Sequence, residues 1–192
     1  MLILKDMISH GSVRACYYHP MNNSLCVKVA LKKKHNKLLQ KEIKNNLLFQ
    51  KTIGPYVPRY YKLVKTNKGL GLTSDLIYDD NNHLSPRLCD WLRQGKHLTH
   101  ELTTQFDDFF ARLLKYHLWF YDFNDENFLI RTHKNKHYLY FVDTKSLNRH
   151  NSWSTLKLEY FIPFLARRRM LRRIRRFYSA YTKNIPQQFQ KN

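Results

Sequence analysis

Hydrophobic and polar residues alternate along the first third of the chain, with the period of two that is typical of β-strands. In "SLCVKVAL", Leu25, Val27 and Val29 fall on one face of an extended segment. Lys28 falls on the other face. The turn-forming stretches "ISHGS" and "PMNN" separate this run from two earlier ones. The pattern predicts a three-stranded meander with strands at residues 1–7, 13–19 and 24–31.

The period then changes to that of a helix and later returns to that of strands. Over residues 35–54, leucines and an isoleucine recur at helical spacing, and Gly54 with Pro55 ends the run. Residues 59–79 read as a β-hairpin with its turn at residues 67–69. The N-terminal part is therefore expected to contain three strands, one helix and two further strands.

A strongly amphipathic helix is expected from Thr99 onward. Its predicted buried face consists of Leu102, Phe106, Phe109, Phe110, Leu113, Leu114 and His117. The neighbouring predictions are a short helix at 87–95, two strands at 127–130 and 137–143, and a helix within 156–184. Residues 185–192 are predicted to be frayed.

Composition adds a strong positive charge. The 192 residues carry 34 Lys and Arg against 14 Asp and Glu, a formal charge of +20. Such a charge indicates an anionic partner: nucleic acid, an acidic membrane face or a phosphorylated substrate. The three cysteines lack zinc-ligand spacing and are expected to be reduced thiols. No apolar run is long enough for a signal-peptide core or a membrane span, so a cytoplasmic location is expected.

A group of polar residues stands out in "WFYDFNDENFLI". Asp122 and Asn127 are five positions apart, and Asp143 follows at the end of the next predicted strand. Phosphoryl transfer to a hydroxyl uses a carboxylate that accepts the hydroxyl proton. It also uses an amide oxygen and a second carboxylate that hold Mg²⁺ on the phosphates. The alternative is a surface turn in which the Asp and Asn side chains cap backbone groups.

Lys28 and Glu42 favour the catalytic interpretation. Lys28 lies mid-strand between apolar residues, where a lysine otherwise marks an edge strand or extends its amine to solvent. "V-K-V-A" after a hairpin, with Glu42 on the following helix, fits a phosphate-binding lysine that a helix glutamate orients. With Asp122, Asn127 and Asp143 they stand in the order that a protein-kinase site requires.

The chain also resembles a known family over nearly its whole length. "KGLGLTSDLIYDDNNHLSPRL", "YDFNDENFLI" and "YFVDTKS" resemble segments of the YrbL family, described as PhoP regulatory network proteins of the protein-kinase-like superfamily. A more distant similarity is to the kinases that phosphorylate sugars of the lipopolysaccharide core. The resemblance implies that Lys28 contacts the phosphates of ATP and pairs with Glu42. It also implies that Asp122 is the catalytic base, and that Asn127 and Asp143 bind Mg²⁺.

The same resemblance implies a nucleotide-binding loop and a hinge. "ISHGSVRA" would cover the phosphates, with Gly11 and Ser12 at its tip. Leu76, Ile77 and Tyr78 would lie beside adenine. The loop has one glycine where a typical protein kinase has three, which restricts close approach of the backbone to phosphates.

The implied fold is α+β and two-lobed. A five-stranded N-lobe with one helix would span residues 1–77, and a truncated, mainly helical C-lobe would span residues 78–192. Thr144 and Lys145 follow Asp143 in place of the Phe-Gly of protein kinases. The short segment after Asp143 argues against a protein substrate.

A run of arginines lies near the end of the sequence: Arg167, Arg168, Arg169, Arg172, Arg173, Arg175 and Arg176. One interpretation is a solvated helix face. The other is contact with an anion, either a phosphate-bearing substrate or the acidic lipid of the inner membrane face. The sequence has no helix-turn-helix, zinc-finger or stacked-aromatic motif, which argues against nucleic acid.

The expected function is ATP-dependent phosphoryl transfer to a hydroxyl of a small molecule or glycolipid. The altered loop and the missing Phe-Gly keep a second hypothesis open, a pseudokinase that binds nucleotide as a regulatory module without turnover. A third hypothesis is a basic nucleic-acid-binding protein, whose binding would fall steeply with salt.

Overall fold

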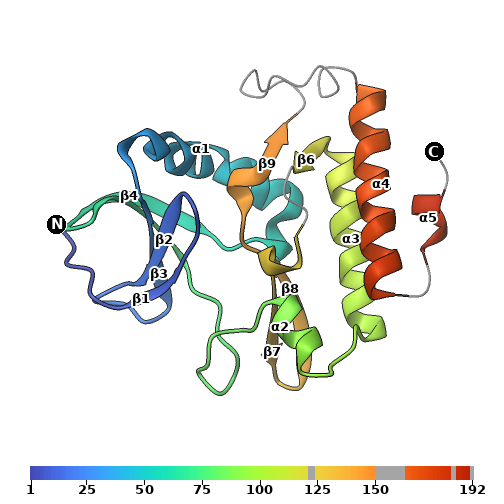
Figure 1. The fold of residues 1–192 in the computed structure, drawn as a ribbon, viewed down its shortest axis with the longest axis horizontal. Helices are drawn as coiled ribbons and strands as arrows, with labels where there is room; N and C mark the ends of the chain where they lie inside the picture. The colour runs from blue at the N-terminus through green and yellow to red at the C-terminus, as the bar shows by residue number, and fades with distance from the viewer. Residues whose placement is uncertain (121–123, 150–162, 183–184, 191–192) are drawn as a thin grey trace.

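The computed structural model describes residues 1–120, 124–149, 163–182 and 185–190. Its strands are β1 (Met7–His10), β2 (Arg14–Tyr18), β3 (Leu25–Ala30), β4 (Tyr60–Thr66), β5 (Gly69–Asp75), β6 (Leu118–Phe120), β7 (Phe128–His133), β8 (Lys136–Phe141) and β9 (Leu147–Arg149). Its α-helices are α1 (Asn36–Ile53), α2 (Leu88–Arg93), α3 (His100–Lys115), α4 (Pro163–Tyr181) and α5 (Gln187–Gln190). Short 3₁₀ helices are η1 (Lys33–His35), η2 (Gly54–Tyr56), η3 (Asp125–Asn127) and η4 (Thr144–Ser146). The fold is α+β in two lobes, as predicted (Figure 1).

A five-stranded antiparallel sheet with the order β1-β2-β3-β5-β4 forms the N-terminal lobe. The central strand β3 is covered on both faces. Val27 and Val29 are at most 2% exposed and pack with Leu4. Lys28, on the other face, lies opposite Leu72, which packs against α1, and is 7% exposed. Lys28 is therefore neither an edge-strand residue nor one that extends its amine to solvent.

The first strand begins later than the hydrophobic pattern predicts. Residues 1–6 are not a strand, and β1 is formed largely by "ISH" of the predicted turn. Leu2 instead makes a parallel bridge with Thr66 beside β4. Leu4 is 2% exposed beneath the sheet. The apolar residues alternate at the N-terminus because an irregular segment places them against the core. The period of two alone does not distinguish such a segment from a strand.

In the C-terminal lobe, α3 and α4 run side by side (Figure 1). The core of this lobe is rich in aromatic side chains from both helices. The predicted face of α3 is fully buried from Leu102 to Leu113, and Leu114 is 6% exposed. The ring centroids of Phe106 on α3 and Phe177 on α4 are 4.7 Å apart. His117 is not part of this face, because α3 ends at residue 115 and His117 is an exposed residue with φ 51°.

The hairpin β7–β8 anchors the segment that carries the predicted metal ligands. Phe128 and Phe141 lie opposite each other, are fully buried and have ring centroids 5.3 Å apart. Beyond them the Val142 amide donates to the Asn127 carbonyl at 2.9 Å. Asn127 and Asp143 therefore leave the hairpin together, at the end away from its turn.

Residues 185–190 pack against the C-terminal lobe, contrary to the prediction of fraying, and residues 191–192 lie outside the described residues. Phe189 on α5 is 1% exposed and stacks on Tyr178 with ring centroids 5.7 Å apart. The Arg175 guanidinium donates to the Phe189 and Gln190 carbonyls. Residues 156–162, where the last long helix is predicted to begin, lie outside the described residues.

Candidate functional site

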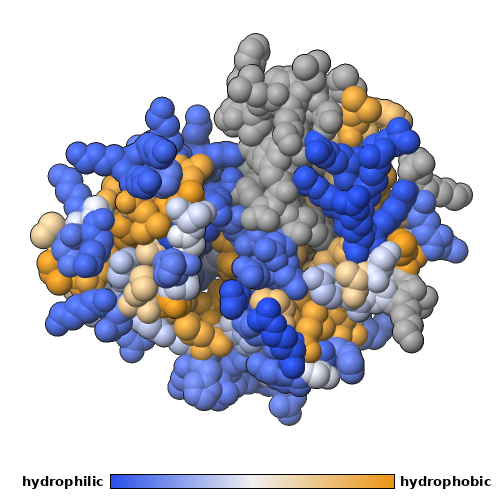
Figure 2. All heavy atoms as spheres, in the orientation of Figure 1, coloured by the Kyte–Doolittle hydropathy of each residue, from blue (hydrophilic) through white to orange (hydrophobic). Residues whose placement is uncertain are grey.

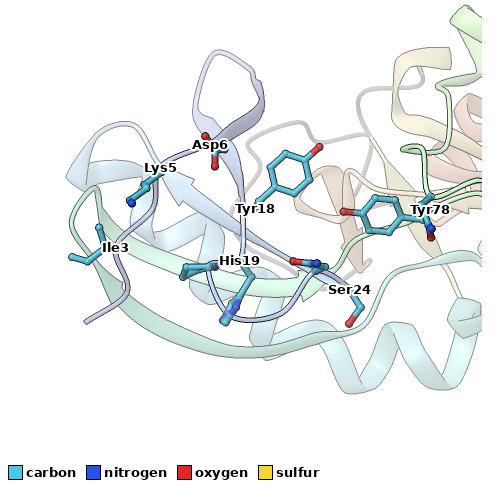
Figure 3. A pocket seen from close by; sticks show the side chains of 10 residues that line it. Ile3, Lys5, Asp6, Tyr18, His19, Ser24 and Tyr78 are labelled. Carbon is cyan, nitrogen blue, oxygen red and sulfur yellow. The ribbon is translucent and has the colours of Figure 1, made fainter.

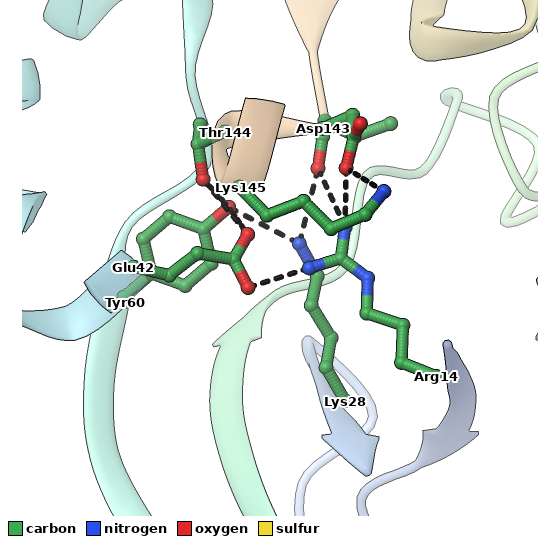
Figure 4. Close-up of polar contacts among 8 residues, drawn as sticks. Arg14, Lys28, Glu42, Tyr60, Asp143, Thr144 and Lys145 are labelled. Atoms are coloured by element: carbon green, nitrogen blue, oxygen red, sulfur yellow. Dashed lines mark hydrogen bonds and ion pairs between the residues drawn. The ribbon is translucent and has the colours of Figure 1, made fainter. Parts of the chain in front are cut away.

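A group of charged and polar side chains lies between the two lobes (Figure 4). We call it the interlobe cluster, and it consists of Arg14, Lys28, Glu42, Tyr60, Asp143, Thr144 and Lys145. The N-terminal lobe supplies the first four from β2, β3, α1 and β4, and the last three follow β8. The cluster contains three residues that the sequence singles out for phosphoryl transfer.

Lys28 connects the sheet to the segment after β8. Its Nζ donates to the Tyr60 hydroxyl at 3.1 Å and to the Val142 carbonyl at 3.2 Å. The same Nζ lies 4.7 Å from the centroid of the Tyr60 ring. The ammonium of Lys28 is thus directed at the part of the chain that carries Asp143.

Glu42 pairs with Arg14, not with Lys28 as the family resemblance implies. Glu42 is fully buried, and its Oε2 lies 2.5 Å from Nη1 of Arg14. Its Oε1 accepts from the Thr144 hydroxyl at 2.9 Å and from the Tyr60 hydroxyl at 3.3 Å. Within the described chain no ion pair joins Lys28 to Glu42, and the Tyr60 hydroxyl bridges them.

Arg14 reaches this position because of the register between β2 and β3. Cys16 lies opposite Lys28, and side chains two residues apart on a strand share a face. Arg14 therefore points to the same side of the sheet as Lys28. The sequence shows that alternation but not the register, so Arg14 is a residue that sequence reasoning misses.

The buried carboxylate of Glu42 and the buried ammonium of Lys28 keep their charges. Burial alone raises the pKa of Glu42, but Arg14 and Lys28 outweigh it and the pKa is lowered overall. Burial opposes the charge of Lys28, yet Tyr60 and Glu42 favour it and the pKa of Lys28 is raised. Burial, with the Glu42 carboxylate, raises the pKa of Tyr60 to about 12. At neutral pH, Tyr60 is therefore a neutral hydroxyl between an ammonium and a carboxylate.

Asp143 and Asn127 offer oxygen ligands that suit a hard cation such as Mg²⁺. Asp143 is 3% exposed, and its Oδ1 accepts from Arg14 at 3.0 Å and from Lys145 at 2.6 Å. No three His, Cys, Asp or Glu side chains gather as a metal site in the part of the chain that the structure describes. Because protein-bound Mg²⁺ often takes one or two carboxylates together with substrate phosphates, this donor set fits Mg²⁺ that arrives with a nucleotide.

Asp122, the predicted catalytic base, lies outside the described residues. The turn that follows it is described and partly fits the capping interpretation. The Asn124 side chain accepts from the Glu126 amide at 3.1 Å, and Asp125 accepts from the Tyr181 hydroxyl at 2.8 Å. The latter contact ties the turn before Asn127 to α4.

The predicted phosphate-covering loop connects β1 to β2. Gly11 and Ser12 are exposed, and the Gly11 amide donates to the Arg14 carbonyl at 2.9 Å. Arg14, the first residue of β2, therefore belongs to the segment predicted to cover the phosphates. Gly11 thus contacts the interlobe cluster through the backbone of Arg14.

Leu76, Ile77 and Tyr78, the predicted hinge, follow β5 directly. The Leu76 amide donates to the Ser24 carbonyl at 2.9 Å, and the Ile77 carbonyl accepts from the Ser85 amide at 3.0 Å. Two backbone groups of the predicted hinge are thus used within the protein.

Tyr78 also lines a pocket of about 840 Å³. The other lining residues are Ile3, Lys5, Asp6, Tyr18, His19, Pro20, Asn23, Ser24 and Asn82. Figure 3 shows the Tyr18 and Tyr78 rings near one another, with Ile3 and Lys5 at the far end. No member of the interlobe cluster lines this pocket, so the two features are separate.

The arginine-rich segment forms α4, and its arginines differ in their surroundings. Arg167, Arg168, Arg172 and Arg176 are exposed, and deep-blue side chains gather along α4 in Figure 2. Arg169, Arg173 and Arg175 are half-buried. The apolar residues between them, such as Ile174, are buried as the pattern predicts. Among the described helices, none is both long and apolar enough to cross a membrane.

Two comparisons with known proteins bear on this chain. The model of the family described as PhoP regulatory network protein YrbL matches residues 1–182. No curated protein matches the chain at a significant level. The family match covers every described residue of the interlobe cluster as well as Asn127 and α4, but its description states no chemical reaction.

Proposed function

The chain belongs to the YrbL family of PhoP regulatory network proteins, and we propose that it is an ATP-dependent phosphotransferase of the protein-kinase-like type. The observation that carries the proposal is the convergence of Lys28 and Glu42, from the sheet and α1, with Asp143 at the end of β8. Asn127 joins them through its backbone contact with Val142. These are the residue types that phosphoryl transfer uses.

Each residue has a defined task in this proposal. Bound ATP would supply the transferable phosphoryl group. Lys28, held by the Tyr60 hydroxyl, would bind the phosphates, and Asn127 with Asp143 would hold Mg²⁺. The carboxylate of Asp122 would accept the proton of the attacking hydroxyl, a role that rests on the D-x-x-x-x-N spacing and on the family resemblance.

The proposed acceptor is a hydroxyl of a small molecule or glycolipid. Helix α4 contributes exposed arginines that suit a phosphate-bearing acceptor. The alternative is a regulatory module that binds nucleotide without turnover, and the altered glycine loop favours it. The alternative predicts nucleotide binding without formation of ADP.

Calorimetric titration of ATP with and without Mg²⁺ tests the proposal without knowledge of the acceptor. We expect binding to the wild type that is stronger with Mg²⁺. Lys28→Ala should weaken binding about 10- to 100-fold, since a hydrogen bond to a charged group contributes about 1.5–3 kcal/mol. Asp143→Asn should remove the gain from Mg²⁺.

A matched control is Asp108→Asn, which changes an ion-paired carboxylate on α3 outside the cluster. Its affinity for ATP should equal that of the wild type. The proposal would be contradicted if the folded wild type did not bind ATP. It would also be contradicted if Lys28→Ala and Asp143→Asn bound Mg·ATP as tightly as the wild type. Far-ultraviolet circular dichroism establishes that each variant is folded.

A further inference from the structure

Arg14 is a largely buried cation that contacts carboxylates from both lobes. Its Nη1 lies 2.5 Å from Glu42 on α1, and its Nη2 lies 3.0 Å from Asp143 after β8. The same Nη2 lies 3.5 Å from the Val142 carbonyl. The side chain of Arg14 is 16% exposed, so these contacts form largely away from water.

The interlobe cluster contains more cations than anions. Arg14, Lys28 and Lys145 are basic, whereas Glu42 and Asp143 are the acidic members. Both hydrogen-bond partners of the Lys28 ammonium, a hydroxyl and a carbonyl, are neutral. Buried charge is unfavourable without a partner of opposite sign. The described cluster therefore carries a net positive charge, which attracts an anion.

The same arrangement opposes the binding of a bare divalent cation. Oδ1 of Asp143 already accepts from Arg14 and Lys145. A divalent cation at Asp143 would be repelled by both of these positive groups. An anion that arrives with the cation removes this repulsion, because Arg14 and Lys145 can then face negative charge.

Arg14 has the geometry for such an anion. A guanidinium presents five N–H donors in a plane and binds phosphate oxygens in pairs. Glu42 holds one side of the Arg14 guanidinium, which fixes its orientation. Arg14 also lies within the predicted phosphate-covering segment "ISHGSVRA", directly after the connection between β1 and β2.

We propose that Arg14 is a second polyphosphate-binding residue beside Lys28, and that the site takes a divalent cation only together with a polyphosphate. This inference rests on the proposed nucleotide site and names a residue that the kinase pattern does not include. Glu42 orients Arg14 in this arrangement, and Asp143 exchanges part of its contact with Arg14 for the cation.

Calorimetric titration with Mg·ATP, tripolyphosphate, adenosine and MgCl₂ tests the inference. Arg14→Gln should weaken binding of Mg·ATP and of tripolyphosphate at least tenfold and leave adenosine binding unchanged. MgCl₂ alone should give no binding to the wild type. Arg112→Gln is a matched control, because Arg112 also joins a carboxylate and a backbone carbonyl but lies on α3.

Two further variants keep the test valid if Arg14→Gln does not fold. Arg14→Gln leaves the Glu42 carboxylate without its guanidinium, so the double variant Arg14→Gln/Glu42→Gln replaces both charges with amides. Arg14→Lys keeps the charge and should bind tripolyphosphate more weakly than the wild type because it lacks the paired donors. Wild-type affinity in whichever of these variants folds would overturn the inference.

The wild-type titrations separate this inference from the proposed function. If the wild type binds Mg·ATP and the Arg14 variants bind it equally well, the inference fails and the proposed function stands. If the wild type binds tripolyphosphate through Arg14 but not ATP, the nucleotide function fails and the anion site stands. Binding of neither ligand overturns both.

Discussion

Replacement of Glu42 by glutamine tests how the two lobes are held together. Glutamine keeps the volume of the side chain and removes its negative charge. In the wild type the fully buried carboxylate contacts Arg14 at 2.5 Å, Thr144 at 2.9 Å and Tyr60 at 3.3 Å. The hydroxyl contacts can persist with the amide oxygen of glutamine. The ion pair with Arg14 cannot.

The expected loss of stability follows from that ion pair. Removing one partner of a buried pair costs about 3–5 kcal/mol, because the other charge stays buried. Arg14 retains Asp143 as a partner, so we expect the lower value, about 3 kcal/mol. A chain of this length shifts its melting temperature by about 2–4 °C per kcal/mol, which gives a decrease of about 6–12 °C.

The effect should depend on pH. The folded-state pKa of Glu42 is lowered, so its contribution to stability is present above its unfolded pKa of about 4.3. That contribution is lost as the pH falls through the lower folded-state value. The difference in free energy of unfolding between the wild type and Glu42→Gln should therefore be full above about pH 5 and decrease below about pH 4.

Urea unfolding between pH 3 and 7 measures these differences. Glu101→Gln is the control, since Glu101 is an exposed glutamate in the first turn of α3 and should change stability by less than about 0.5 kcal/mol. A Glu42→Gln protein as stable as this control, or a difference that is constant with pH, would refute the reasoning. A double-mutant cycle with Arg14→Gln isolates the coupling between the two side chains.

Two further predictions concern the sheet and the basic helix. Gly71→Ala should destabilise the protein by about 1–3 kcal/mol in urea unfolding, because a Cβ there would lie 2.6 Å from the Val27 side chain. Gly54→Ala is the control and should be tolerated, because the nearest atom to its Cβ would lie at 3.5 Å. Equal stability of the two variants would contradict the packing argument. If α4 contacts anionic lipid, replacing three exposed arginines by glutamine should weaken binding to phosphatidylserine vesicles about 100-fold, at about 1 kcal/mol per basic residue. The control replaces three exposed lysines of η1 and α1 by glutamine, and equal binding by the arginine variant and this control would exclude the contact. The arginines are Arg168, Arg172 and Arg176, and the control lysines are Lys33, Lys37 and Lys44, of which Lys33 precedes the helix.

The period of hydrophobic residues predicts those helices and strands that have one face against the core and the other face toward solvent. The buried face of α3 from Leu102 to Leu114 can be predicted from the sequence because its residues all belong to the same aromatic core. The secondary structure of the N-terminal segment cannot be predicted in this way. Leu2 and Leu4 have the spacing of a strand, yet they bury their side chains from a segment that pairs only at one bridge. Likewise, the polar context of Phe189 predicts fraying, and the stacking on Tyr178 that orders it is a tertiary contact.

Three members of the interlobe cluster, Lys28, Glu42 and Asp143, were predictable from the sequence, but their contact partners were not. Lys28 and Glu42 stand out by residue type and spacing, and both point into one cluster. Which cation meets Glu42 depends on the register of β2 against β3, which sets Cys16 opposite Lys28 and brings Arg14 to the same face. Register is fixed by pairing across strands, so no local pattern in the sequence identifies Arg14.

The exchange of partners has a consequence for the proposed chemistry. In the pattern of protein kinases the helix glutamate holds the phosphate-binding lysine. Here Glu42 is committed to Arg14, and a neutral hydroxyl of Tyr60 holds Lys28. The full charge of Lys28 therefore stays available to an incoming anion, while Arg14 links the lobes through Glu42 and Asp143. Stability of the lobe contact and affinity for polyphosphate thus depend on the same guanidinium, so a polyphosphate that binds Arg14 must also change how strongly Asp143 joins the two lobes.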